Sequence, residues 1–263
     1  MLWYLSRRSG GLPRAQSELR TCAVGLGLHM ELDLGRLTDC LTYAFGVGEN
    51  DVEAAFRCLA GPEPVVLDVG ANIGTATLAF ARLRPLGRVY AFEPSASMRT
   101  ALAKNLALNR PRNVQIVPLA LGNAAAKSHL KAAMPLNPGS AYVSNDATVG
   151  DDEPIDVVRL DDWLAADVRV DFIKLDVEGF ELRALKGAAG TLRRSWPDLI
   201  FEMNEEALAR AGTSGAELLE WITSLGYKIH ELERGRIVSH RRRPDDDGRL
   251  LNLIAVNPQR RGQ

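Results

Sequence analysis

The chain has 263 residues and a mass of 28.7 kDa, which suits one large domain or one domain with an added lobe. Lys and Arg number 32 and Asp and Glu number 33, so the formal net charge of −1 argues against a nucleic-acid binder with a strongly basic face. Hydrophobic residues make up 46% and charged residues 25%, a mix that excludes disorder of the whole chain because it supplies enough apolar surface for a core.

Cysteine usage and the first residues favour a cytoplasmic protein. Cys22, Cys40 and Cys58 form neither a C-x-x-C pair nor a zinc-site spacing, so we expect three buried thiols in a reducing compartment. The apolar run 2–5 precedes two arginines, which is the reverse of the order in a signal peptide. No uninterrupted apolar stretch approaches the ~18 residues of a membrane span, so none is predicted.

The first 62 residues are interpreted as an N-terminal arm and cap. Residues 1–20 are polar and contain glycine and proline, which predicts a loose arm that can exchange between the subunits of a homodimer. Residues 21–62 hold short apolar stretches and then a predicted helix from Asn50 to Leu59. The rest of the chain, residues 63–263, is expected to form the main domain.

From residue 64 the sequence alternates between strands and helices. Val65–Val69 is a short apolar run that ends in a turn, which is typical of a strand buried on both faces. Helical spacing follows over 73–83, then a strand at Arg88–Phe92, a helix capped by Ser95 or Ser97, and a strand at Val114–Val117. Strand–helix–strand repeats of this kind predict parallel β-α-β units.

Residues 122–160 interrupt this alternation and are predicted to be an inserted β-hairpin with a lid loop. Strands are expected at Ser128–Ala132 and Ile155–Leu160, and the residues between them, Met134–Pro154, are rich in Gly, Asn, Ser and Asp. A loop of this length in a compact domain is usually functional. We therefore expect it to cover the site where a substrate binds, with Asn137 and Ser140 as contacts to that substrate.

The alternation then resumes to the end of the chain. The predicted elements are a strand at Phe172–Asp176, one helix carrying Leu182 to Leu192, a strand at Leu199–Met203, a helix at Gly215–Leu225, and closing strands around Lys228–Leu232, Arg236–His240 and Leu251–Val256. The expected fold is α/β, with a doubly wound, mostly parallel, seven-stranded Rossmann-like sheet.

The ends of the first two strands carry residues suited to a nucleoside. In open α/β sheets, ligands bind beyond the carboxyl ends of the strands. The turn from Asp68 to Gly74 differs from the dinucleotide fingerprint G-x-G-x-x-G because Asn72 occupies the position of the second glycine. The negative charge of Asp68 also disfavours a phosphate group at this turn. Glu93 ends the second strand, where a carboxylate can accept both hydroxyls of a ribose. These features fit S-adenosylmethionine; the alternative is that both acids only stabilise helix N-termini.

With these motifs in place, the chain resembles the FkbM family of S-adenosylmethionine-dependent O-methyltransferases, within the class I methyltransferases. The resemblance extends over roughly residues 45–205, and its most specific part is the block Lys174-x-Asp176-x-Glu178-Gly-x-Glu181. The segment before the first strand also resembles the family, with Gly48 where a Tyr often precedes Glu49. The motifs that carry it are Val66–Gly74, Ala91–Pro94, Leu119–Gly122 and Ile173–Glu181.

The resemblance implies a class I methyltransferase sheet and a role for each motif residue. The methionine part of the cofactor would be held by Asp68, Gly70, Asn72 and Gly74, the ribose by Glu93, and the adenine by Ala120 and Leu121. Glu49 would be a further cofactor-binding residue. Asp176 would face the transferred methyl group and the incoming hydroxyl.

Acidic and basic residues also lie together on the predicted strands Phe172–Asp176 and Leu199–Met203 and directly after them. Lys174 and Asp176 are two apart and share one strand face, and Glu202 ends the neighbouring strand. A buried lysine beside acids is best explained as a hydrogen-bonded ionic cluster. A carboxylate in reach of an attacking hydroxyl can serve as general base, so Asp176 and Glu178 are predicted to be catalytic. Lys174, from the same cluster, is the third predicted catalytic residue. Glu202 and Asn204 are predicted acceptor contacts.

Other interpretations of this cluster stay open. Asp176 can cap the following helix, and Glu178 and Glu181 can complement its dipole. The alternative bases are His29, His129 and His230. A divalent metal held by Asp176, Glu202 and Asn204 is a further alternative, which the positive charge of Lys174 disfavours.

The predicted function is methyl transfer from S-adenosylmethionine to a hydroxyl of a secondary metabolite, such as a polyketide or a glycosylated natural product. A cell-surface or lipid-linked glycan is the alternative acceptor, and nucleic acid is not expected as a partner. Two other classes are an NAD-type oxidoreductase and a non-catalytic binding module. Asn72 and the absence of a Tyr-x-x-x-Lys pair count against the oxidoreductase.

Overall fold

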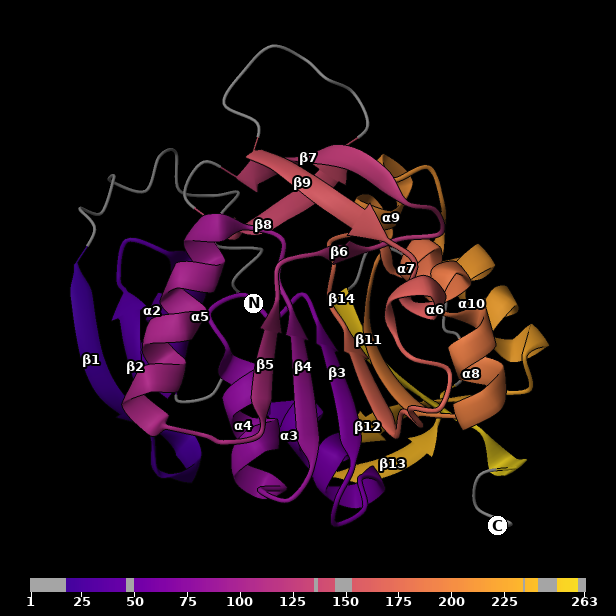
Figure 1. Ribbon diagram of the computed structural model, residues 1–263, viewed down its shortest axis with the longest axis horizontal. Coiled ribbons are helices and arrows are strands. Elements are labelled where there is room, and N and C mark those ends of the chain that lie inside the picture. Colours follow the sequence, from indigo (N-terminus) through magenta and orange to yellow (C-terminus); the bar gives the residue numbers. More distant parts are fainter. Residues whose placement is uncertain are drawn as a thin grey trace.

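An eight-stranded, mostly parallel sheet forms the centre of the protein (Figure 1). The computed structural model describes residues 18–45, 50–134, 137–144, 153–233, 235–240 and 250–259. In sheet order the strands are β13 (Arg236–Ser239), β12 (Lys228–Glu233), β14 (Leu250–Val256), β11 (Asp198–Asn204), β10 (Phe172–Leu175), β3 (Val65–Val69), β4 (Arg88–Phe92) and β5 (Val114–Val117). The five strands from β11 to β5 run parallel, and the other three pair antiparallel.

The predicted doubly wound sheet is therefore confirmed, but the prediction of seven strands was wrong. The extra strand is β13, which pairs antiparallel with β12 from Glu233↔Arg236 to His230↔Ser239. Gly235 lies between these two strands with φ +76°, a conformation that glycine adopts without steric cost. The closing strand predicted around Arg236–His240 is thus present and forms the edge of the sheet as one arm of a short hairpin.

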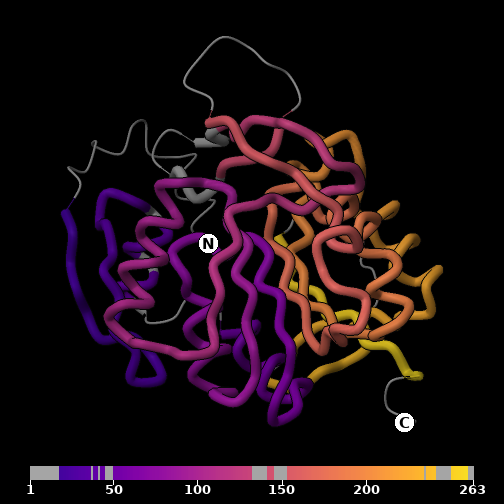
Figure 2. The backbone as a smooth tube through the Cα atoms, in the orientation of Figure 1, coloured from indigo at the N-terminus to yellow at the C-terminus, as the bar shows by residue number. Residues whose placement is uncertain are grey.

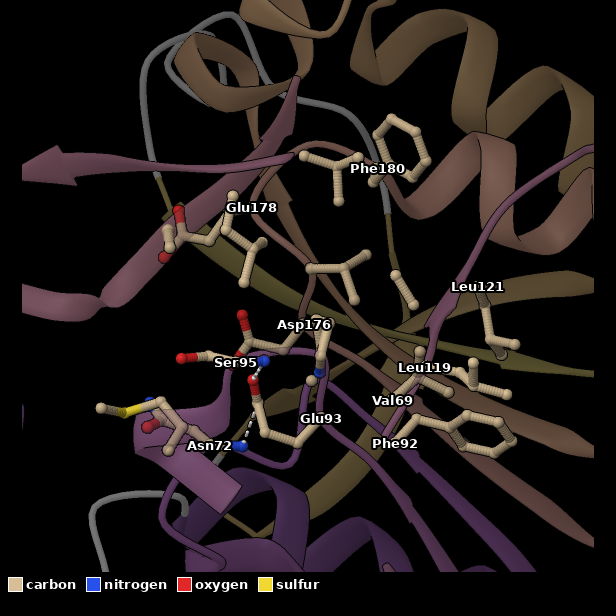
Figure 3. A pocket seen from close by; sticks show the side chains of 18 of the residues that line it. Val69, Asn72, Phe92, Glu93, Ser95, Leu119, Leu121, Asp176, Glu178 and Phe180 are labelled. Carbon is tan, nitrogen blue, oxygen red and sulfur yellow. Dashed lines mark hydrogen bonds between the residues drawn. The ribbon is translucent and has the colours of Figure 1, made fainter. Parts of the chain in front are cut away.

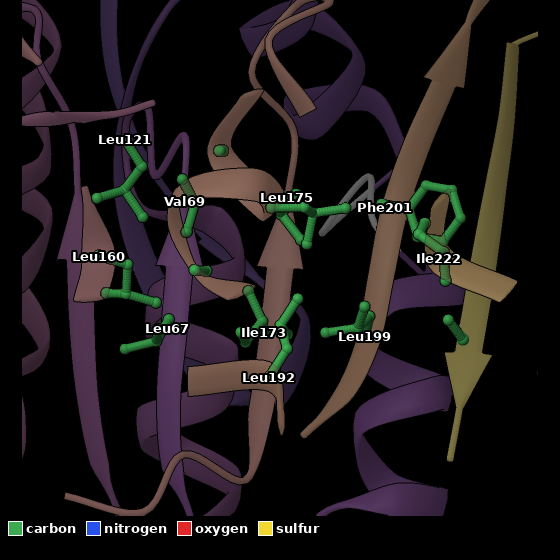
Figure 4. Close-up of a cluster of buried hydrophobic side chains, with 14 of the residues drawn as sticks. Leu67, Val69, Leu121, Leu160, Ile173, Leu175, Leu192, Leu199, Phe201 and Ile222 are labelled. Carbon is green, nitrogen blue, oxygen red and sulfur yellow. The ribbon is translucent and has the colours of Figure 1, made fainter. Parts of the chain in front are cut away.

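Helices cover both faces of the sheet because the central strands are buried on both sides. One face packs against α6 (Leu160–Trp163), α7 (Glu181–Gly187), α8 (Ala189–Ser195) and α10 (Gly215–Ser224). Figure 4 shows the aliphatic core of this face, in which Leu67, Ile173 and Leu199 lie on adjacent strands in register.

The opposite face packs against α3 (Asn50–Leu59) and α4 (Thr75–Leu83). Phe56 of α3, Phe80 of α4 and Phe172 of β10 meet there, with ring centroids 4.5 to 5.7 Å apart. The boundaries of α3 agree with the helix predicted from the sequence.

The N-terminal cap contains a hairpin that the sequence did not predict. Strands β1 (Leu19–Val24) and β2 (Leu28–Asp33) are joined by a 3-10 turn at Gly25–Gly27 and followed by α2 (Leu37–Phe45). The hairpin packs on α5 (Ala96–Asn109), where the side chain of Asn105 accepts the N–H of Glu31 at 2.7 Å. Figure 2 shows the backbone of this hairpin in indigo, at the left of the molecule and beside α5.

A second sheet lies across the carboxyl ends of the central strands (Figure 1). It consists of β6 (Ala120–Leu121), β9 (Glu153–Val158), β7 (Ala126–Met134) and β8 (Asn137–Ser144), in that order. The prediction of a loop was wrong at Asn137–Ser144, because this segment is a strand that pairs with β7. Its residues Ala141 and Val143, two positions apart, pack against an apolar cluster. The four strands together are called the roof sheet below.

Two further predictions need correction. The single helix predicted from Leu182 to Leu192 is divided into α7 and α8 at Ala188. Next to this break the backbone of Gly187 approaches that of Gly122 so closely that a Cβ on Gly187 would lie 1.9 Å from the Gly122 oxygen. The thiol of Cys58 is exposed and the other two are half-buried, so the three cysteines are not buried residues. Among the described residues, no helix is long and apolar enough to cross a membrane.

Candidate functional site

A cavity of about 950 Å³ opens where β3, β4 and β10 end, beneath the roof sheet (Figure 3). Eight of the residues predicted from the sequence line it, namely Gly70, Asn72, Glu93, Ala120, Leu121, Asp176, Glu178 and Glu202.

The turn after β3 brings the chain against the end of β10. Gly70 has φ +86°, and a Cβ at this position would lie 1.9 Å from the backbone oxygen of Asp176. Only glycine permits this approach, so Gly70 fixes Asp176 relative to the turn. Gly74 does not line this cavity, because a Cβ there would instead meet the side chain of Leu102 on α5.

Glu93 presents a nearly buried carboxylate to the cavity. Its Oε2 accepts the backbone N–H of Asn72 and its Oε1 accepts that of Ser95, each at 2.8 Å (Figure 3). Burial raises the pKa of Glu93 to about 7, while these two N–H donors act in the opposite direction. Each oxygen keeps a lone pair for a ligand hydroxyl.

Asp68 lies behind the cavity and does not line it. Its side chain is fully buried, and Oδ2 accepts a hydrogen bond from the hydroxyl of Thr77. The Nζ of Lys174 lies 3.8 Å from Oδ1, and burial raises the pKa of Asp68. The predicted direct contact between Asp68 and a cofactor therefore has no support in this arrangement.

Lys174 joins Asp68 to Asp176. The Nζ of Lys174 lies 3.4 Å from Oδ2 of Asp176, and the lysine side chain is 5% exposed, whereas that of Asp176 is 37% exposed. The buried ammonium is thus paired on both sides, as a buried charge requires. The predicted pairing of Lys174 with Asp176 is present, with Asp176 as the exposed end, but the second acid of the cluster is Asp68 in place of the expected Glu202.

The acidic side chains of Glu178, Glu181 and Glu202 interact electrostatically with Asp176, and few positive charges offset them. Burial first, and then repulsion by Asp176, raises the pKa of Glu178 to about 7 and that of Glu202 to about 10. Glu181 is 2% exposed, and its Oε1 accepts the N–H groups of Val177 and Gly179, so it supports the loop rather than facing the cavity. Burial raises the pKa of Glu181 to about 7.

The roof sheet closes the cavity from above, which the sequence did not predict residue by residue. Leu130, Ala141 and Val143 line the cavity from β7 and β8. At the start of β9, Glu153 accepts a hydrogen bond from the Ser95 hydroxyl at 2.9 Å and another from the N–H of Ala96 at 2.5 Å. A carboxylate at the N-terminus of α5 therefore fastens the roof sheet beside Glu93.

Several predicted contacts fall elsewhere. Glu49 lies outside the described residues, as do the side chains of Asn137 and Ser140, whose backbone belongs to β8. Asn204 caps α9 (Glu205–Arg210) through the N–H of Ala207 and does not line the cavity. None of His29, His129 and His230 lines it either.

Other lining residues carried no recognisable sequence signal. Thr38 reaches the cavity from α2 and Phe180 from the loop before α7, as the close-up in Figure 3 shows for Phe180. Within the described ranges, no three His, Cys, Asp or Glu side chains are grouped as metal ligands.

Comparison with known proteins agrees with this geometry. The profile of the methyltransferase FkbM domain matches residues 68–229, which is more than half of the chain. Methyltransferase 1 of Beauveria bassiana is 30% identical over 142 residues, covering 46% of this chain and 57% of that protein. The 2-O-methyltransferase NoeI of Sinorhizobium fredii is 30% identical over 152 residues, covering 52% of this chain and 62% of that protein.

Solved structures are more distant. A crystal structure of the methyltransferase FkbM from Methylobacillus flagellatus is 20% identical, with a TM-score of 0.48, over 74% of this chain and 44% of that one. The chain spans less than two thirds of the length of each of these relatives. Because the family profile covers the strands and turns that build the cavity, we conclude that this chain belongs to the FkbM family of methyltransferases.

Proposed function

We propose that the protein transfers a methyl group from S-adenosylmethionine to a hydroxyl of a small molecule. The observation that carries this proposal is that Glu93 and Asp176 open into one cavity from neighbouring parts of the sheet. The family membership supports methyl transfer, and the name of one relative, 2-O-methyltransferase NoeI, supports oxygen as the acceptor atom. A secondary metabolite is the proposed acceptor, and a glycan is the second candidate.

The donor groups of the cavity fit S-adenosylmethionine. The two Glu93 oxygens suit a pair of ribose hydroxyls, and the apolar side chains of Phe92, Leu119 and Leu121 suit an adenine. A second cavity of about 770 Å³ shares Gly70, Asn72 and Asp176 with the first and continues to Thr38 and Lys174. This continuation suits the charged amino-acid end of the cofactor.

The chain's own residues then have distinct tasks in the reaction. The cofactor supplies, when bound, a methyl group on a positively charged sulfur. The Oδ atoms of Asp176 accept the proton of the attacking hydroxyl, and Lys174 holds that carboxylate in place from 3.4 Å. Leu130 and Val143 of the roof sheet exclude water from the cavity, which favours transfer to the acceptor over hydrolysis.

Binding of S-adenosylhomocysteine, measured by calorimetry, tests the cofactor site. We expect the wild type to bind and Glu93→Gln to bind about 10-fold to 100-fold more weakly, since hydrogen bonds to charged groups contribute about 1.5–3 kcal/mol. Because the pKa of Glu93 is raised to about 7 and the ribose hydroxyls favour the ionised form, affinity should fall as the pH drops below about 7. Glu93→Gln should remove most of this pH dependence.

Three results would contradict the proposal. One is a folded wild type that binds NAD and not S-adenosylhomocysteine, which would favour the oxidoreductase. Another is binding of S-adenosylhomocysteine that Glu93→Gln leaves unchanged, which would place the ribose elsewhere. A protein that binds the cofactor but transfers no methyl group to any acceptor would correspond to the non-catalytic binding module.

A further inference from the structure

A separate cavity lies at the end of the central strands opposite the roof sheet. It is bounded by the carboxyl-terminal ends of α4 and α5, by the loops that lead from these helices into β4 and β5, and by Leu28 of the N-terminal hairpin. Figure 1 shows α5 running away from the roof sheet towards this end of the molecule. In the described part of the chain, this cavity shares no lining residue with the two cavities described above. It is therefore distinct from the site proposed for methyl transfer.

The floor of this cavity is apolar. Leu28, Leu78 and Ala81 line it with side chains that are 3%, 1% and 3% exposed. Pro85 adds an exposed hydrocarbon ring at the rim. Filling an apolar floor with an apolar group removes hydrocarbon surface from water, which is favourable. We therefore expect a ligand of this cavity to carry an apolar part.

Three arginines give the same cavity a positive charge. Arg82 lies in the last turn of α4, Arg110 ends α5, and Arg112 lies in the loop before β5. None of the three guanidinium groups has a hydrogen bond or ion pair with another described residue, and no Asp or Glu is among the described residues that line the cavity. Guanidinium groups bind phosphate oxygens through paired, charge-assisted hydrogen bonds. The cavity thus offers phosphate-binding donors that the described fold does not use.

Helix dipoles explain only part of this charge. A cation in the last turn stabilises a helix, which accounts for Arg82 on α4. Arg112 lies outside both helices, and Arg110 has a left-handed φ of +51°. This conformation has a steric cost for a residue with a Cβ, and glycine at the end of a helix avoids that cost. A strained arginine at the cavity indicates that the position requires its side chain.

We propose that this cavity binds a phosphate monoester with an apolar organic part, which lies against the floor while Arg82, Arg110 and Arg112 hold the phosphate. Such a phosphate carries a charge of about −1.5 to −2 near pH 7, which the three guanidinium groups balance. A dissolved phosphate ester and the phosphate headgroup of a lipid present the same group. The inference does not depend on the proposed function, because none of these arginines lines the cavity that contains Glu93.

Calorimetric titration of the full chain with phenyl phosphate, at low ionic strength and about pH 7.5, tests the site. We expect one molecule to bind, at least tenfold more tightly than inorganic phosphate, which lacks the apolar part, or phenyl sulfate, which carries a single charge. Arg82→Gln and Arg112→Gln should each raise the Kd about tenfold, since each removes charged hydrogen bonds at an exposed position without disturbing the core.

Arg110→Gly separates binding from folding. Glycine adopts the left-handed conformation without strain, so the melting temperature should equal or exceed that of the wild type. The Kd for phenyl phosphate should nevertheless rise about tenfold, because the guanidinium is lost. A purely structural arginine would show no such loss of affinity.

Arg193→Gln is the matched control for Arg82→Gln. Arg193 is also exposed and also lies in the last turn of a helix, α8, but it does not line the cavity. Its replacement removes the same charge from a similar position and should leave the Kd within about twofold. Glu93→Gln should also leave this Kd unchanged, since an anion bound beside Glu93 would instead bind more tightly once that carboxylate is removed.

Sedimentation with vesicles distinguishes the two sources of the phosphate. The vesicles contain phosphatidylcholine alone or an equimolar mixture with phosphatidic acid. Arginine-dependent sedimentation with the mixture alone would assign the site to a lipid headgroup, and arginine-dependent binding of phenyl phosphate without sedimentation would assign it to a dissolved ester.

The inference fails if neither probe binds, or if phenyl phosphate binds no more tightly than phenyl sulfate. It also fails if Arg82→Gln and Arg193→Gln weaken binding equally, since overall charge would then explain the affinity, or if Glu93→Gln tightens binding. A polyuridine oligonucleotide that displaces phenyl phosphate with the same arginine dependence would assign this face to nucleic acid and overturn the proposal.

Discussion

Gly70 is the residue through which the glycine turn controls the position of Asp176. Gly70→Ala would combine a left-handed φ of +86° with a Cβ 1.9 Å from the Asp176 oxygen, so β3 and β10 would have to separate. We expect a loss of about 2–4 kcal/mol in the free energy of unfolding, measured by denaturant titration. The variant should also bind S-adenosylhomocysteine more weakly at a temperature where it is still folded.

Gly27→Ala is the matched control for this substitution. Gly27 has a similar φ of +67°, but nothing lies within 4 Å of its added Cβ. It should therefore lose only the strain of the left-handed conformation, about 1 kcal/mol, and keep wild-type affinity. Equal losses for the two variants would show that backbone conformation, and not the contact with Asp176, explains the requirement for Gly70.

At the residue scale, sequence reasoning succeeded where a side chain acts close to its own strand end. Glu93 and Asp176 each follow a recognisable buried strand, and both line the predicted cavity. Asp68 also belongs to a recognisable buried strand, but its side chain interacts with Thr77 and Lys174 inside the protein. Lys174 lies 106 residues further along the chain, so a local sequence pattern does not reveal this contact. Thr38 was missed because it reaches the cavity from α2, which precedes the strands in the sequence.

At the scale of elements, the carboxylate of Glu153 joins the roof sheet to α5. Glu153→Gln removes the charge that accepts from Ser95 and Ala96 at the N-terminus of the helix. We expect a loss of about 1–2 kcal/mol in stability and weaker binding of S-adenosylhomocysteine, because Glu93 lies two residues from Ser95. Thermal melts with and without ligand, together with calorimetry, measure both effects.

Asp156→Asn on the same strand is the control for Glu153→Gln. Asp156 pairs with Lys127 at 2.5 Å, but the two side chains are 49% and 85% exposed, so removing the pair should change stability by less than about 1 kcal/mol. If both variants behave alike, Glu153 makes no special contribution and the roof sheet is held by its apolar contacts alone.

The elements with strong periodicity were predicted accurately, and those with mixed composition were not. The predicted boundaries of β4 and β5 agree with the structure because short apolar runs between turns leave little choice. Strand β8 was predicted to be a loop because Asn137, Pro138 and Gly139 suggest a turn, whereas pairing with β7 overrides that local preference. Tertiary contact decides the structure of such segments.

For the molecule as a whole, buried carboxyl groups should make stability depend on pH. The pKa values of Glu93, Glu178 and Glu181 are raised to about 7, above the ordinary value near 4.5 that holds in the unfolded chain. The folded state therefore retains protons that the unfolded state releases. This stabilisation is complete below about pH 4.5 and is lost as the pH rises through about 7, at about 1.4 kcal/mol per pH unit for each retained proton.

Glu181→Gln tests this behaviour without touching the cavity lining. The amide can still accept the N–H groups of Val177 and Gly179, but it has no proton to lose. Urea titrations from pH 5 to 8 should show a decline in unfolding free energy that is smaller than in the wild type by up to one proton's contribution. Glu220→Gln, at an exposed position, should keep the wild-type slope, and an unchanged slope in Glu181→Gln would contradict the assignment.

The overall architecture followed from alternation of strands and helices, but the placing of the inserted segment did not. The sequence marks residues 122–160 as a departure from the repeat, and the roof sheet extends from Ala120 of β6 to Val158 of β9. The contact of Glu153 with α5 holds the roof sheet over Glu93. The residues that Glu153 contacts, Ser95 and Ala96, precede it in the sequence by 58 and 57 positions. Contacts of that separation are set by packing of the complete chain.

The roof sheet also begins and ends at one point of the molecule. Leu121 pairs with Val158, and the N–H of Gly122 donates to the oxygen of Val158 at 2.9 Å, so the chain leaves and re-enters the main domain through neighbouring residues. A segment with adjoining ends can be exchanged or resized while the closure entropy changes only slowly with its length. The roof sheet can thus be shortened or replaced as one unit, and such a variant would show how far the cavity beside Glu93 depends on its cover.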